Sequence, residues 1–310
     1  MQMKLENYQK LIKKERDLYF KTSFERAYQA FVELELDQKK PDFFEKNASV
    51  IIENMREQCW NDFMKEESSF TIYMMKKLIP TLSYDKMNIE EAIGHYLEAY
   101  PEHIYQLCLS NTQSRRSRAG KEFEHIIELI LMGAGISIDS QGNIGKDKFV
   151  EKGLGKLVDV VSPGVVEFEI NKRKAVLISA KTTLRERWQE VPEEMGRTGA
   201  REMFLATLDE KVTDNVLNAL YEANIQLTTT KRNKDTNYPN NDRVLTFEEL
   251  IHICRDNKND WKNFSYTLEQ ANQQCKLLEV QIEKHSEHPF VENALNERFM
   301  TYLSIIKDLQ

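Results

Sequence analysis

The segment Val176-Leu-Ile-Ser-Ala-Lys-Thr-Thr-Leu-Arg-Glu-Arg-Trp188 joins an apolar run to a cluster of charged residues. The run from Ala175 to Ser179 consists of small, aliphatic and β-branched residues, which favours a β-strand. Lys181 follows this strand, and an Arg-Glu-Arg triplet at 185–187 comes directly after the next turn of chain. The segment therefore predicts a strand that delivers charged side chains to the edge of a sheet.

Similar short runs, bounded by Gly, Pro, Asn or Lys-rich turns, surround this segment. We expect strands at Leu157–Val161, Val165–Ile170, Ala175–Ser179, Met203–Thr207 and Ile225–Thr229. Helical patterns are interleaved with them at Ala119–Met132, Val191–Ala200, Asp214–Ala223 and Phe247–Arg255. This alternation predicts an α/β domain with a central mixed β-sheet flanked by helices.

Both flanks of this region have helical patterns. From Leu5 to about Leu109 apolar residues recur at helical spacing, and Asp85 or Asn88 can cap the last of these helices. The helical pattern returns after Trp261 and continues to the end of the chain. We therefore expect a helical N-terminal region at 1–110, an α/β domain at 111–260, and a C-terminal helical segment at 261–310. That last segment would pack on the N-terminal region or on a second subunit.

Composition indicates a folded protein. Hydrophobic residues make up 41% of the 310 residues, charged residues 30% and aromatic residues 10%. The four cysteines form no C-x-x-C pair, and the N-terminus lacks the pattern of a signal peptide, so we expect reduced thiols and a cytoplasmic location. No apolar run approaches the roughly 20 residues of a membrane span, so we expect no membrane role.

The net charge of −7 does not by itself favour a nucleic-acid-binding protein. Local charge decides such binding, however, and divalent metal ions neutralise a carboxylate cluster that would otherwise repel phosphates. The acidic surplus is therefore compatible with a metal-dependent nuclease.

Four residues fit the chemistry of phosphodiester hydrolysis. Asp159 lies in one expected strand, Lys181 ends a neighbouring strand, and Glu194 and Glu124 lie on expected helices. Carboxylates hold the divalent cations that polarise a phosphate, and a nearby lysine orients or deprotonates the attacking water. Taken singly, each residue is an ordinary surface charge. Their occurrence together, in this order and spacing, favours a nuclease.

With these residues, the chain resembles the type II restriction endonucleases with the PD-(D/E)xK fold, in the EcoRII-like and NgoMIV-like group that cuts CCGG, CCNGG or CCWGG sites. In that group the acidic residue two positions before the lysine is absent, and a glutamate on the following helix replaces it. Ser179 and Glu194 match these two positions, and Glu124 ends a matching segment that begins at Gln113. The chain departs from the pattern at Val158, where the family has a proline.

The resemblance implies a Mg²⁺-dependent enzyme, with Mn²⁺ able to substitute. Asp159, Glu194 and Glu124 would hold the metal, and Lys181 would support the attacking water. The choice of Glu194 over the adjacent Glu193 follows the family spacing alone. The resemblance also implies a prokaryotic protein that acts on double-stranded DNA as a homodimer or a higher homo-oligomer.

The recognition segment follows from base-edge chemistry. Arg185 and Arg187 can each donate two hydrogen bonds to a guanine, and Glu186 can accept from cytosine amino groups. We therefore expect a short palindrome with a CC/GG core, of the CCGG type, for which W^CCGGW is one form. The resemblance places Gln113 against the inner base pairs from the minor groove.

A basic cluster at the start of the expected helix 119–132 suits DNA phosphates or base edges, and it consists of Arg115, Arg116, Arg118 and Lys121. Two other interpretations remain open. One is a repair or structure-specific nuclease of the same fold, and the other is a non-catalytic DNA-binding or partner-binding module.

Overall fold

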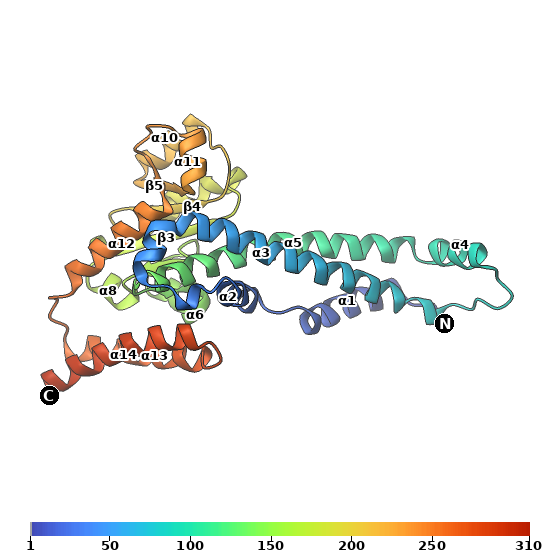
Figure 1. Cartoon of the computed structure of the whole chain (residues 1–310), viewed down its shortest axis with the longest axis horizontal. Helices are drawn as coiled ribbons and strands as arrows, with labels where there is room; N and C mark the ends of the chain where they lie inside the picture. Colours follow the sequence, from blue (N-terminus) through green and yellow to red (C-terminus); the bar gives the residue numbers. More distant parts are fainter. Residues whose placement is uncertain (1) are drawn as a thin grey trace. The chain divides into compact units, whose positions relative to one another are not determined.

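The computed structural model describes residues 2–310, which form two compact units. The first, which we call the helical unit, contains the described residues up to Arg26 together with Glu57–Glu122. The second, the sheet unit, contains Ala27–Arg56 and Phe123–Gln310. Two long helices, α3 and α5, each contribute residues to both units (Figure 1). Residue 110 lies inside α5.

The N-terminal half of the chain is helical, as its apolar spacing predicts. Its elements are α1 (Leu5–Tyr19), α2 (Ser23–Glu33), η1 (Leu36–Gln38), α3 (Pro41–Lys76), η2 (Ile79–Thr81), α4 (Ile89–Ala99) and α5 (Pro101–Gly133). Asn88 is the N-cap of α4 and forms a capping box with Glu91, which selects it over Asp85. The core of the helical unit is rich in aromatic residues, and Phe20, Phe63 and Phe70 lie at its centre.

The sheet unit contains a six-stranded mixed sheet in the order β1-β2-β3-β4-β5-β6. The strands are β1 (Asp139–Ser140), β2 (Val160–Ser162), β3 (Val176–Lys181), β4 (Met203–Thr207), β5 (Ile225–Thr229) and β6 (Val244–Thr246). β1, β2 and β3 pair antiparallel, whereas β3 to β6 pair parallel. The predicted α/β class with a central mixed sheet is therefore confirmed. β3 is the strand at which the pairing changes.

Helices precede, separate and follow these strands, and they lie around the sheet (Figure 1). They are α6 (Gln141–Ile144), α7 (Lys146–Glu151), α8 (Val165–Ile170), η3 (Lys172–Lys174), η4 (Arg185–Gln189), α9 (Glu190–Thr198), α10 (Asp214–Glu222), α11 (Lys231–Asn237), α12 (Phe247–Trp261), α13 (Leu268–Lys284) and α14 (Pro289–Leu309). The inner strands carry almost continuous apolar runs because helices cover both faces of such a sheet. β4, for example, is buried along its whole length.

The strand expected at Val165–Ile170 is wrong, since these residues form the helix α8. Val165, Val166, Glu167 and Phe168 are all buried, so the segment shows no exposed face that would reveal a helical period. A short apolar run of this kind cannot be assigned to strand or helix from periodicity alone. Here Pro163 and Gly164 end β2, and the N–H of Val165 donates to the carboxylate of Asp139 at 2.8 Å.

The two C-terminal helices pack against each other and against the sheet unit. α13 contacts α6 and α8, and Arg298 on α14 donates to Asp139 of β1 at 2.8 Å. The guanidinium of Arg298 also lies 3.8 Å from Glu167. This buried ion network fixes the C-terminal helices to the edge of the sheet. Among residues 2–310, no helix combines the length and apolarity that crossing a bilayer requires.

Candidate active site

The two residues with the clearest catalytic signature lie on neighbouring strands. Asp159 immediately precedes β2, and Lys181 is the last residue of β3. The pairing of Val160 with Ile178 places Asp159 opposite Ser179. Because side chains alternate along a strand, Asp159, Ser179 and Lys181 share one face of the sheet.

Asp159 and Lys181 form a buried ion pair. Asp159 Oδ2 accepts from Lys181 Nζ at 2.9 Å and from the backbone N–H of Ala180 at 2.7 Å. Lys181 Nζ also donates to the carbonyl of Ala180 at 3.0 Å. The two side chains are only 7% and 13% exposed, so their orientations are held by packing as well as by charge. The structure thus brings together two of the predicted catalytic residues.

The loop that leads to Asp159 is held from two sides. The N–H of Gln141 donates to the carbonyl of Asp159 at 2.9 Å, and its side-chain amide donates to the carbonyls of Lys156 and Val158 at 3.2 and 3.3 Å. On the other side, the carboxylate of Glu194 accepts from the N–H of Lys156 and, at 3.4 Å, from that of Leu157. Glu194 is therefore bound to the same loop that positions Asp159.

Gly155 permits this close approach. It has a φ of +71 to +77° like the other left-handed glycines of this region, at +76°, and a Cβ there would collide with the carboxylate of Glu194. Only glycine satisfies both conditions at low cost. The adjacent Glu193 is different, because its side chain is 70% exposed and pairs with Arg197 on the surface of α9.

Glu124 is half-buried on α5, one helical turn before Glu128. Glu128 is 2% exposed and lies 3.4 Å from Nδ1 of His125. Burial acts to raise the pKa of Glu128, but its interactions with His125 and Ser140 outweigh burial and lower that pKa. The carboxylates of α5 are therefore part of a polar cluster that includes the start of α6.

The donor set suits a hard divalent cation. Within residues 2–310, no three carboxylate, histidine or cysteine side chains converge as a closed metal cage. Mg²⁺ does not need one, because it keeps several waters and binds through one or two carboxylates together with substrate phosphates. No described residue donates to Asp159 Oδ1, and Ser179 Oγ on the same face is buried without a hydrogen-bond partner. These oxygens fit a Mg²⁺ ion with its water ligands.

The segment after Lys181 is anchored so that its charged triplet points outward. Leu184 is buried, and its N–H donates to Asp209 Oδ2 at 2.5 Å. Arg185, Glu186 and Arg187 are all exposed on η4. The guanidinium of Arg187 donates to the carbonyl and the hydroxyl of Thr183. The triplet thus extends from a fixed base next to the Asp159–Lys181 pair.

Sequence reasoning missed Asp209 and Gln141, which position these segments. Asp209 lies just after β4, at the carboxyl end of a parallel strand, where functional loops of α/β sheets converge. That position was a usable signal. Gln141 had none, because its role depends on the short strand β1 bringing it beside Asp159.

The basic cluster of α5 lies in the helical unit, where two of its members make internal contacts. Arg115 Nε donates to Glu67 at 2.7 Å. Arg118 donates to the carbonyl of Lys21 at 2.7 Å and stacks over the ring of Phe20, and burial lowers its pKa. Gln113, Arg116 and Lys121 are at least partly exposed. Contacts of this cluster with DNA, and those of Gln113, remain predictions.

A mixed sheet that presents an Asp–Lys pair on adjacent strands, with a carboxylate from the following helix beside it, defines the PD-(D/E)xK class of nucleases. Known proteins give the same assignment. The family described as EcoRII C terminal matches residues 82–251. The type II restriction enzyme SsoII of Shigella sonnei is 50% identical over 291 residues, which cover 94% of this chain and 95% of that protein. The chain therefore belongs to the EcoRII C-terminal family and is a type II restriction endonuclease.

Solved structures agree with this assignment. Metal-depleted Ecl18kI in complex with uncleaved, modified DNA superimposes with a TM-score of 0.90 at 47% identity, covering 96% of this chain and all of that one. The restriction endonuclease PspGI, in a complex with substrate DNA, has a TM-score of 0.57 at 19% identity, covering 78% of this chain and 94% of its own. The likeness to PspGI supports the fold alone. The predicted enzyme class and fold are confirmed.

Proposed function

We propose that this enzyme hydrolyses phosphodiester bonds in both strands of double-stranded DNA at a short palindrome with a CC/GG core, in a Mg²⁺-dependent reaction. The observation that carries the proposal is the ion pair between Asp159 and Lys181, 2.9 Å apart, at the strand ends from which the Arg-Glu-Arg segment departs. The chain's similarity to SsoII and Ecl18kI over almost its whole length supports the same reaction class.

Asp159 and Glu194 would hold the Mg²⁺, with Glu124 contributing from α5. When bound, the metal ion would polarise the scissile phosphate, stabilise charge on the leaving oxygen and lower the pKa of a coordinated water. Glu194 would have to release the amides of Lys156 and Leu157 in part, since its carboxylate accepts from both. Mn²⁺ would substitute, because it also prefers oxygen ligands.

Lys181 would act on the attacking water and the phosphate. An ammonium group has three donors, and two of them are used by Asp159 Oδ2 and the carbonyl of Ala180. The third can bind the attacking water or a non-bridging phosphate oxygen and stabilise negative charge as it develops. The water oxygen attacks phosphorus, the bond from phosphorus to O3′ breaks, and O3′ takes up a proton. The products would be 5′-phosphate and 3′-hydroxyl ends.

Recognition would come from the exposed triplet on η4. Arg185 and Arg187 would each grip O6 and N7 of a guanine, and Glu186 would accept from cytosine amino groups. A palindrome has two-fold symmetry, so we propose that two copies of the chain act together as a homodimer. Gln113 and the basic cluster of α5 would contact the inner base pairs and the phosphates.

The test is digestion of phage DNA with the purified enzyme and Mg²⁺, followed by run-off sequencing of the ends. We expect discrete fragments that share one CC/GG palindrome. The CCGG, CCNGG and CCWGG forms are distinguished directly by the sequenced ends. Omission of the metal in EDTA should abolish cutting, and Mn²⁺ should restore it.

Lys181→Ala and Asp159→Ala should each abolish cutting on this time scale, while Lys211→Ala, an exposed lysine of the same unit, should cut like the parent enzyme. Cutting by Lys181→Ala at the parental rate would refute the catalytic assignment. Uniform cutting of unrelated sequences would instead indicate a repair or structure-specific nuclease. A parent enzyme that binds neither Mg²⁺ nor Mn²⁺ in calorimetry would be a non-catalytic module.

A further inference from the structure

The helix α4 in the helical unit leaves its apolar side open. None of its eleven residues is buried. Ile89, Ile93 and Leu97 are 81%, 56% and 53% exposed, and their spacing of four residues places them on one stripe. Scattered exposed apolar residues are ordinary, but a contiguous stripe on one helix marks an interaction surface.

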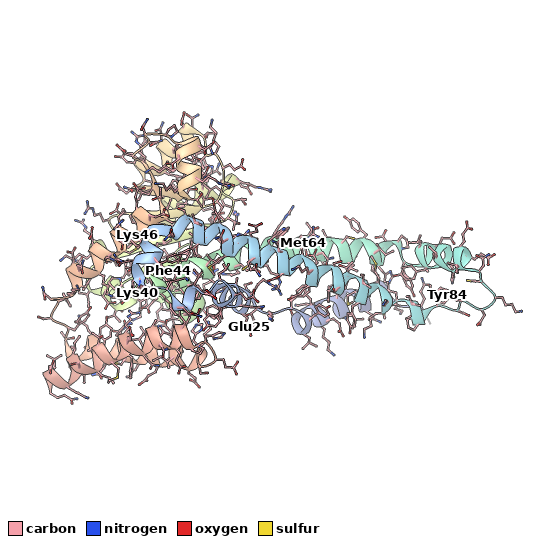
Figure 2. All side chains as sticks on the ribbon, in the orientation of Figure 1. Glu25, Lys40, Phe44, Lys46, Met64 and Tyr84 are labelled. Atoms are coloured by element: carbon pink, nitrogen blue, oxygen red, sulfur yellow. The ribbon has the colours of Figure 1, made fainter. Side chains whose placement is uncertain are left out.

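A cavity continues this stripe. It has a volume of about 520 Å³, and it lies between α4 and the end of α3 with η2. Ile72 and Ile79 form its other wall and are themselves 53% and 45% exposed. Tyr84, in the turn that leads to α4, also lines it (Figure 2). We call the surface formed by Ile72, Ile79, Ile89, Ile93 and Leu97 the α4 face.

The exposure of the α4 face is not the result of a poorly formed helix. The N-terminus of α4 has a complete capping box between Asn88 and Glu91. Tyr96 Oη donates to the carbonyl of Met75 at 3.1 Å, which ties α4 to the end of α3. The helix is therefore fixed with its apolar stripe outward, so that another surface can dock without rearrangement.

Charged residues around the α4 face restrict what can cover it. Glu90, Glu91 and Glu98 on α4 are exposed, and they would repel the phosphates of a duplex. Lys76, at the end of α3, and Lys86, before α4, are also exposed. The face therefore carries both signs of charge around an apolar centre.

We infer that the α4 face docks on a second copy of this chain. In a two-fold contact, a point on one side of the axis meets the opposite side of the other copy, so a patch with separated lysines and glutamates complements itself. The ridge of Ile89, Ile93 and Leu97 next to a cavity has the same property of shape. The inference rests on the proposed function in one respect, since cutting both strands of a palindrome requires two active sites.

The experiment measures association of the full-length enzyme by sedimentation velocity across a range of concentrations. We expect the parent to be a dimer and Ile93→Glu to raise the dissociation constant about 100-fold, because the variant places a carboxylate at the apolar centre of the contact. Met300→Glu on α14 is the matched control, since Met300 is 59% exposed and lies outside the α4 face. The control should dimerise like the parent, and both variants should keep the parental melting temperature because neither residue is buried.

Cleavage separates the failure of this inference from the failure of the proposed function. If the parent is a monomer, or if Ile93→Glu and Leu97→Glu dimerise as tightly as the parent, the α4 face is not the contact. If the parent dimerises through the α4 face but leaves every duplex intact, the proposed function fails and the interface stands. A weakened variant should accumulate nicked plasmid at low enzyme concentration and recover double-strand cutting at high concentration.

Discussion

Replacing His285 with glutamine should reduce the loss of stability that the protein suffers in mild acid. His285 is 1% exposed, and its Nε2 lies 2.8 Å from Asn143 Oδ1. Burial, followed by the positive charges of Lys284 and His288, lowers the pKa of His285 from 6.5 to about 4. Asn143 belongs to α6, whose first residue, Gln141, binds the carbonyl of Asp159. The histidine therefore supports the catalytic loop through α6.

The sign and size of the effect follow from proton linkage. Between pH 6.5 and pH 4 the unfolded chain binds a proton at His285 and the folded chain does not, so stability falls as the pH falls through this window. At about 1.4 kcal/mol per pKa unit, the whole shift corresponds to about 3 kcal/mol, and this contribution is fully present only above pH 6.5. His285→Gln retains an amide that can donate to Asn143 but cannot take up the proton.

The assay is urea unfolding followed by tryptophan fluorescence at several values from pH 7 to pH 4. The parent should lose about 3 kcal/mol more than His285→Gln across this range. His95→Gln, in the helical unit, is the control for removing a histidine elsewhere, and it should leave the pH dependence unchanged. Identical pH dependence in the parent and in His285→Gln would show that His285 is not held neutral by its surroundings.

Three further substitutions test the site and its support. Gly155→Ala should lower stability by about 1–2 kcal/mol because of its left-handed backbone, and it should also weaken Mg²⁺ binding in calorimetry by displacing Glu194; unchanged metal affinity would contradict the contact. Arg298→Leu should cost about 3–5 kcal/mol in urea unfolding, since it leaves the buried carboxylate of Asp139 without its cation, and a loss below 1 kcal/mol would count against the network. Arg187→Ala should lose about 1–3 kcal/mol of discrimination at one G·C pair in competition binding, whereas equal selectivity would exclude a base contact.

The sequence predicts most of the sheet and its chemical edge. Ala175–Ser179, Met203–Thr207 and Ile225–Thr229 are strands in the structure, because runs of this length and composition between turn residues have few other stable arrangements. The proximity of Asp159 and Lys181 also follows, since one residue lies at the start of a strand and the other at the end of its antiparallel neighbour.

The contacts that hold this edge in place could not be predicted from the sequence. β1 has only two residues, too few for any periodic signal, yet it brings Gln141 beside Asp159. The approach of Glu194 to the loop before Asp159 depends on a glycine at 155, and a glycine alone does not reveal which side chain will fill its space. Such contacts join residues far apart in the chain, and they are set by packing.

The same contacts explain how one segment can serve both chemistry and recognition. Lys181 ends a strand that pairs antiparallel with β2 on one side and parallel with β4 on the other. The β2 side supplies Asp159, which binds the lysine, and the β4 side leads to Asp209, which binds the N–H of Leu184. The chain between Lys181 and Leu184 is thus fixed at both ends by acidic residues from opposite neighbours. A base contact made by the Arg-Glu-Arg triplet would therefore act on a rigid lever of a few residues, so a mismatched base would displace Lys181 as well as weaken binding. On this reasoning, Asp209→Ala should reduce sequence discrimination more than it reduces affinity for DNA, and an equal loss in both would indicate that the anchor serves only folding.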